Sequence, residues 1–199
     1  MQSSIGQIEK EIRRKRRGRI YFASDFVAFG SPDAVKKSLS RLEKSGFLVR
    51  IAFGIYLYPN IDKKFGIGIL YPSVEDIAKE IAERDKARIV PTGIYALNAL
   101  GLSTQVPMNA VFLTDGAPRK IKIYKQKIVF KHVTPKNLAY RSNVLMLVVA
   151  AIKEIGKGNL SASELEKLKS VLSYETKENI LLDLELAPAW IKKIILSII

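Results

Sequence analysis

Five polar side chains between residues 36 and 44 have the types and the spacing needed to bind a nucleic acid. On a helix with about 100° per residue, Leu39 and Leu42 lie within about 40° of Val35, and the three side chains form an apolar stripe. The opposite half and its flank carry the polar set: Lys36, Lys37, Ser40, Arg41 and Lys44. Such a helix can enter a DNA major groove, where Arg and Ser reach base edges and Lys neutralises phosphates. Arg41 is the best candidate for reading guanine, because its planar guanidinium matches the O6 and N7 acceptors.

A second basic cluster lies between residues 119 and 131 and contains no acidic residue. Its members are Arg119, Lys120, Lys122, Lys125, Lys127 and Lys131. Two interpretations are open for this second basic cluster: contact with a polyanion, or charges that are only solvated on exposed strands.

The net charge favours a polyanionic partner, because 33 Lys and Arg residues against 19 Asp and Glu residues leave +14 in a chain of 199 residues. This charge is +7 over residues 1–60, +6 over 61–140 and +1 over 141–199. Binding is therefore expected in the first two thirds, and apolar packing in the last third.

The residue types exclude several kinds of chemistry. With no cysteine and the single histidine His132, the chain cannot form disulfides, Cys-based metal sites or thiol nucleophiles. Gly66-Ile67-Gly68 lacks the third glycine of a dinucleotide fingerprint, and no phosphate-binding loop with Gly-Lys-Ser/Thr exists. We expect no metal, no cofactor and no enzymatic activity.

The alternative is a metal-dependent nuclease or another nucleic-acid-processing enzyme with a DNA-binding domain. Asp115 closes a predicted strand, and Glu175-Thr176-Lys177 has the tripeptide pattern that such nucleases use. However, the tripeptide begins a predicted helix, and the strands after Asp115 contain no acid. Asp183 is interpreted as a helix-surface residue and His132 as a surface residue without a ligand role. A protein that binds RNA without sequence preference is a further alternative.

The N-terminal elements predict a winged helix-turn-helix domain over residues 1–60. Ser31 and Pro32 are a strong helix start, and Gly46 can end that helix. The predicted order is helix 4–17, strand 20–22, short helix 24–29, helix 31–45, and a hairpin of strands 47–52 and 55–58. Its candidate DNA contacts are Arg19, Ser31, Lys36, Lys37, Ser40, Arg41, Lys44 and Arg50. The basic run that ends at Arg19 is expected beside the DNA backbone or in a minor groove.

Residues 61–199 are predicted to form an α+β domain with a small, mainly antiparallel sheet and C-terminal helices. After a linker at 59–72, the predicted helices are 73–86, 92–100, 139–156, 161–173 and 176–198, the last broken near Pro188. The predicted strands are 110–114, 119–125 and 127–133. Trp190 begins an apolar stripe that ends at Ile198, for which core packing is the default and a homodimer or partner surface the alternative. Neither the polar N-terminus nor the apolar run 144–152 suits a membrane span, so we expect a cytoplasmic protein.

Two stretches resemble AbiEi-type antitoxins of type IV toxin–antitoxin (abortive infection) systems. AVKKSLSRLEKSGFLVRIAFGIYLYP (34–59) is similar to their winged helix, which ends in GxYxxP. PTGIYALNALGLSTQVP (91–107), followed by AVFLTDGAPRKIKI, is similar to the more specific run of their second domain. The resemblance covers 20–59 and 88–135. It implies a DNA-binding repressor that acts on the operator of its own operon in phage defence, a nucleotidyltransferase-like toxin as functional partner, and a C-terminal domain that serves antitoxicity.

Overall fold

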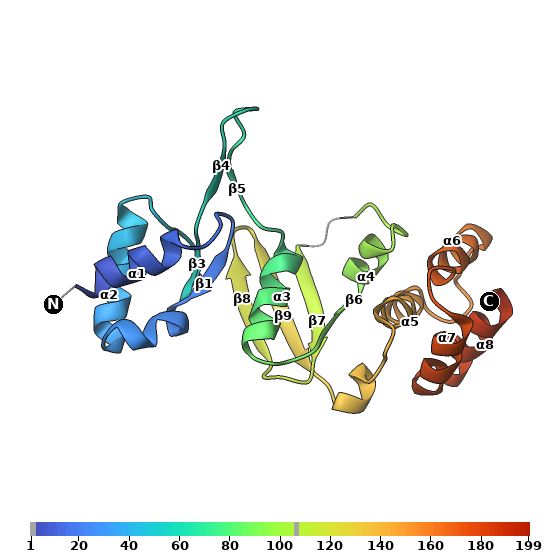
Figure 1. Ribbon diagram of the computed structural model, residues 1–199. Helices are drawn as coiled ribbons and strands as arrows, with labels where there is room; N and C mark the ends of the chain where they lie inside the picture. The colour runs from blue at the N-terminus through green and yellow to red at the C-terminus, as the bar shows by residue number, and fades with distance from the viewer. Residues whose placement is uncertain (1–2, 106–107) are drawn as a thin grey trace. The chain divides into compact units, whose positions relative to one another are not determined.

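The computed structural model describes residues 3–105 and 108–199 and has a mixed α+β fold (Figure 1). The chain divides into two compact units. Unit 1 comprises Met1–Glu80 and Lys122–Tyr124, and unit 2 comprises Ile81–Ile121 and Lys125–Ile199.

The first part of unit 1 combines helices with a three-stranded antiparallel sheet. Its helices are α1 (Ser4–Arg13), the 3₁₀ helix η1 (Ala23–Phe29) and α2 (Pro32–Lys44). Its strands are β1 (Ile20–Phe22), β2 (Val49–Ala52) and β3 (Ile55–Leu57), in the order β1-β3-β2. The buried core includes Ile8 and Ile12 of α1, Phe26 of η1, and Leu39 of α2. The alternation of apolar residues at helical spacing therefore directs all three helices onto one core.

Two predictions about this region need correction. The first helix ends at Arg13 rather than at residue 17, and the Arg17 side chain beyond it donates to the Pro59 carbonyl oxygen at 2.9 Å. The expected linker at 59–72 contains an antiparallel hairpin of β4 (Asn60–Asp62) and β5 (Gly68–Leu70). Its turn is formed locally, since a carboxylate oxygen of Asp62 accepts hydrogen bonds from two backbone amides. Helix α3 (Val74–Arg84) follows.

The sheet of unit 2 has the strand order β6-β7-β9-β8. Its strands are β6 (Ile89–Thr92), β7 (Asn109–Thr114), β8 (Arg119–Ile123) and β9 (Gln126–His132), and helix α4 (Ile94–Ala99) follows β6. The pair β6–β7 is antiparallel, whereas β7–β9 is parallel. The predicted strands do not include β6, which contains Pro91. The strand tolerates this proline because it lies at the sheet edge.

The chain ends in a set of helices, as the sequence predicts. They are η2 (Pro135–Leu138), α5 (Asn143–Ile155), α6 (Ala162–Leu172), α7 (Lys177–Asp183), η3 (Leu184–Leu186) and α8 (Ala189–Ile198). Ile191 and Ile195 of α8 are fully buried, and Trp190 is partly buried against the same cluster. Much of the apolar stripe between Trp190 and Ile198 is therefore buried in the hydrophobic core. Within the described ranges, no helix is long and apolar enough to cross a membrane.

Candidate nucleic-acid interface

Helix α2 is fixed in place by its cap and by one buried face. The Ser31 hydroxyl accepts a hydrogen bond from the Ala34 amide at 3.3 Å, and Pro32 occupies the first helical turn. Val35, Leu39 and Leu42 are buried, as the helical spacing predicts. Their burial orients the helix, so its opposite side faces solvent.

The solvent side of α2 carries four exposed cations: Lys36, Lys37, Arg41 and Lys44. In the part of the chain that the structure describes, none of the four forms an ion pair with an acidic side chain. Ser40 is only half-buried at the margin of this face, and Ser31 is exposed although its hydroxyl already caps the helix. The charges of α2 are therefore available to an external anion.

Two further cations lie on or next to the strands of the three-stranded sheet in the same unit. Arg50 of β2 is exposed, and its guanidinium lies 5.6 Å from the ring centre of Phe53 at the turn between β2 and β3. The Phe53 side chain is itself 87% exposed. Arg19, which precedes β1, is exposed and stacks on Tyr21 at 5.9 Å. Sequence reasoning placed Arg50 and Arg19 in the interface but missed Phe53, whose position in a two-residue turn is the signal for its exposure.

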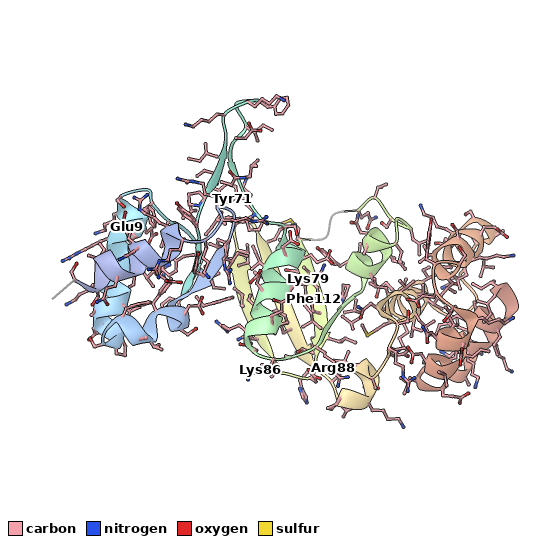
Figure 2. All side chains as sticks on the ribbon, in the orientation of Figure 1. Glu9, Tyr71, Lys79, Lys86, Arg88 and Phe112 are labelled. Atoms are coloured by element: carbon pink, nitrogen blue, oxygen red, sulfur yellow. The ribbon has the colours of Figure 1, made fainter. Side chains whose placement is uncertain are left out.

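In the basic run before β1, some arginines interact with other residues of the chain, whereas other cations are exposed to solvent. Arg13 pairs with Glu9, which is labelled in Figure 2, at 2.6 Å, and Arg14 pairs with Glu11 at 3.2 Å. Arg17 stacks on Tyr58 at 4.7 Å besides donating to Pro59. The remaining cations of the run, Lys15 and Arg16, are exposed. The run therefore supplies fewer charges to a ligand than its sequence indicates.

The members of the second basic cluster also differ from one another. Lys120, Lys122, Lys125, Lys127 and Lys131 are all exposed. Arg119 instead pairs with Asp85, stacks on Phe130 at 5.3 Å, and has a buried Nε atom without a hydrogen-bond partner. Burial lowers the pKa of the Arg119 guanidinium, and the charge of Arg84 lowers it further. Arg119 is thus a structural residue, whereas the lysines remain candidates for phosphate contact.

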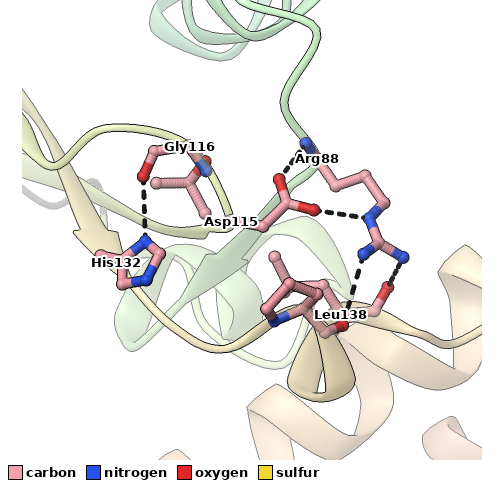
Figure 3. Close-up of polar contacts among 7 residues, drawn as sticks. Arg88, Asp115, Gly116, His132 and Leu138 are labelled. Carbon is pink, nitrogen blue, oxygen red and sulfur yellow. Dashed lines mark hydrogen bonds and ion pairs between the residues drawn. The ribbon is translucent and has the colours of Figure 1, made fainter.

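The carboxylate that could have served a nuclease is held by an arginine (Figure 3). One Asp115 oxygen accepts from the Arg88 backbone amide at 2.7 Å, and the other accepts from Arg88 Nε at 2.8 Å. Partial burial raises the pKa of Asp115, but the hydrogen bonds and charge of Arg88 together outweigh it and lower the pKa. Arg88 also donates to the carbonyl oxygens of Leu138 and Pro135, while His132 Nδ1 lies 3.0 Å from the Gly116 carbonyl oxygen.

The other acidic residues considered for catalysis also have structural partners. Glu175 accepts from the Ser142 hydroxyl at 2.8 Å. Asp183, which the sequence placed on a helix surface, is only 3% exposed and accepts from the backbone amides of Arg141 and Ser142 at the start of α5. This position is favourable because a carboxylate there satisfies free amides at a helix N-terminus. Over residues 3–105 and 108–199, no three His, Asp or Glu side chains are grouped so that they could hold a metal ion.

The run 91–107 contains a turn after α4. The Asn98 side chain donates to the carbonyl oxygens of Ser103 and Gln105, and the Gln105 amide donates to the Ser103 hydroxyl at 3.1 Å. The last two residues of the run, 106 and 107, lie outside the described residues. The described part of this run therefore consists of the end of β6, helix α4 and a hydrogen-bonded turn.

Comparisons with known proteins give a family and a distant structural likeness. A family model described as a family of unknown function, DUF6088, matches residues 7–180. No curated protein matches the chain. Among solved structures, the crystal structure of the RV2827C protein from Mycobacterium tuberculosis is similar with 14% sequence identity and a TM-score of 0.46. That match covers 99% of this chain and 82% of the other.

Proposed function

The chain belongs to the DUF6088 family, whose function is unknown, and we propose that it binds duplex DNA sequence-specifically and represses transcription of its own operon. The DNA-binding part is residues 1–60, acting as a winged helix-turn-helix. The partner is the operator DNA upstream of its gene, with no catalysis by this chain.

The arrangement of elements in unit 1 supports this proposal. Helix, strand, short helix, capped helix and hairpin follow one another, and β1 pairs with β3 of that hairpin. In winged helix-turn-helix proteins this order presents the second helix of the helix-turn-helix pair to the major groove, flanked by the hairpin. Here that helix would be α2, and the hairpin would be β2–β3.

The solvent face of α2 carries the proposal. Four exposed cations without acidic partners, within the described residues, lie opposite a buried apolar face on one capped helix. Arg41 is the residue suited to a guanine, since a guanidinium can donate two parallel hydrogen bonds. Lys36, Lys37 and Lys44 end in single ammonium groups, which suit phosphates.

The resemblance to AbiEi-type antitoxins supports the biological role. On that basis the chain is an antitoxin of a type IV system, and its functional partner is a nucleotidyltransferase-like toxin. Residues 61–199 would then serve antitoxicity.

The test is a binding measurement with purified full-length protein and the intergenic duplex immediately upstream of its gene. We expect binding at least about a thousandfold tighter than to a scrambled duplex at the same salt concentration. Equal binding to both duplexes would contradict sequence specificity and favour a non-specific nucleic-acid-binding protein. Adding Mg²⁺ or Mn²⁺ should leave the DNA intact, and cleavage that disappears in Asp115→Ala would establish the nuclease alternative.

A further inference from the structure

The hairpin of β4 and β5 presents large apolar side chains at its tip. Phe65 is 73% exposed and Ile67 is 67% exposed. The tip is nevertheless ordered by hydrogen bonds, because Asp62 Oδ1 accepts from the amides of Lys64 at 2.6 Å and Phe65 at 3.0 Å. The two strands form a separate two-stranded sheet (Figure 1), and its register places Ile61 opposite Ile69. Exposed apolar groups gathered on a narrow ribbon of this kind mark an interaction site.

The tip combines this apolar surface with positive charge. Lys63 and Lys64 are exposed, and Lys64 Nζ lies 5.3 Å from the ring centre of Phe65. The β2–β3 hairpin of the same unit has a similar contact between a cation and a ring, because Arg50 stacks on the exposed Phe53. A cation beside a free phenyl ring suits DNA, since the cation can neutralise a phosphate while the ring enters a base step.

The hairpin starts beside the basic run that precedes β1. Arg17 donates to the Pro59 carbonyl oxygen at 2.9 Å, and the Gly18 amide donates to the Tyr58 carbonyl oxygen at 2.7 Å. The exposed Arg16 is thus a sequence neighbour of the residues that hold the base of the hairpin. At about 3.3 Å per residue, β4 extends about 7 Å from Asn60 to Asp62, which is comparable to the depth of a DNA minor groove, and the turn that carries Phe65 lies beyond its end.

We propose that the β4–β5 hairpin is a second DNA-contact element, which inserts Phe65 into a base step from the minor groove. Lys63 and Lys64 hold the flanking phosphates. This inference rests on the duplex-DNA binding proposed for α2, but it adds a different kind of recognition. Insertion of a ring unstacks and bends the duplex, so the hairpin selects deformable base steps rather than base edges. The lysines at the tip favour this polyanion over a second copy of the chain, whose net charge of +14 would be repelled.

The experiment compares full-length variants on the duplex immediately upstream of the gene. This duplex carries a fluorophore at each end, so that energy transfer between the two fluorophores reports DNA bending. Phe65→Ala should weaken binding about tenfold or more and abolish most of the bend. Its salt dependence should not change, because no phosphate contact is removed. Phe65→Leu should retain part of the bend, since leucine also acts as an apolar wedge. Replacing both Lys63 and Lys64 by Gln should lower the salt slope by about two units.

The matched control is Tyr174→Ala, which removes an aromatic side chain of unit 2 that is 86% exposed. This control should bind and bend DNA like wild type. The proposal is overturned if Phe65→Ala also does so. It is likewise overturned if Phe65→Ala changes only the sedimentation of the protein or its binding to anionic vesicles, because the tip would then be a protein or membrane surface. If wild type fails to distinguish the upstream duplex from a scrambled one, specific repression fails, whereas the loss of bending in Phe65→Ala can still be measured on either duplex.

Discussion

Replacing Asp115 by Asn tests whether this carboxylate has a structural role. One oxygen of Asp115 accepts from the Arg88 amide, and this hydrogen bond can survive in the variant. The other oxygen accepts from Arg88 Nε. In the variant the side-chain NH2 group of Asn would take the place of this oxygen, and it cannot accept a hydrogen bond from the N–H of Arg88. Losing one charge-assisted hydrogen bond costs about 1.5–3 kcal/mol, which we reduce to about 1–2 kcal/mol because the Arg88 side chain is 52% exposed.

The pH dependence of this loss has a defined sign. Because folding lowers the pKa of Asp115, its contribution is present above the unfolded-state pKa and disappears as pH falls through the lower folded-state pKa. Urea denaturation of wild type and Asp115→Asn should therefore differ by a constant amount from pH 7 down to about pH 5, and the difference should shrink below about pH 4.

The control is Glu166→Gln, which neutralises an exposed acid on α6 and should leave the free energy of unfolding within about 0.5 kcal/mol. The reasoning is refuted if Asp115→Asn is as stable as wild type at pH 7, or if the loss of stability grows on acidification. DNA binding should be unchanged, since Asp115 lies in unit 2 and α2 lies in unit 1.

The remaining predictions concern the DNA-binding face, the core and the second basic cluster. Arg41→Ala should cost about 1–3 kcal/mol of binding free energy and relax preference at one base pair, measured by competition with a set of singly substituted duplexes. Leu39→Ala should lower the free energy of unfolding by about 2–5 kcal/mol, because Leu39 is fully buried in the core of unit 1. Neutralising Lys120, Lys122 and Lys125 together should flatten the salt dependence of DNA binding while far-UV circular dichroism stays unchanged. An unchanged salt slope would make these lysines solvated surface charges.

Local sequence signals predicted much of unit 1. Ser31 and Pro32 predicted the start of α2, and the spacing of its apolar residues predicted which side chains face solvent. Such features depend on neighbours within one or two helical turns, so they can be recognised without the tertiary structure.

The errors occurred where partners are distant in sequence or where composition is ambiguous. Asp183 accepts from the amides of Arg141 and Ser142, and Arg119 pairs with Asp85, and neither pairing leaves a local pattern. The glycines of residues 66 and 68 suggested a linker, but their positive φ angles allow the turn of the β4–β5 hairpin. Among the candidate contacts, the exposure of the α2 cations was predicted. The exposure of Phe53 was missed although its two-residue turn signals it, and the exposure of Phe65 was missed because the hairpin that carries it was interpreted as a linker.

Sequence-specific recognition of duplex DNA by α2 is the central claim, and one competition experiment tests it most directly. Labelled upstream duplex is bound to wild-type protein at fixed salt, then displaced by unlabelled upstream duplex or by a scrambled duplex of the same composition. The account predicts that the scrambled duplex competes about a thousandfold less well, and that Arg41→Ala narrows this ratio while the protein remains folded. Equal competition by the two duplexes, or a ratio that Arg41→Ala leaves unchanged, would contradict it.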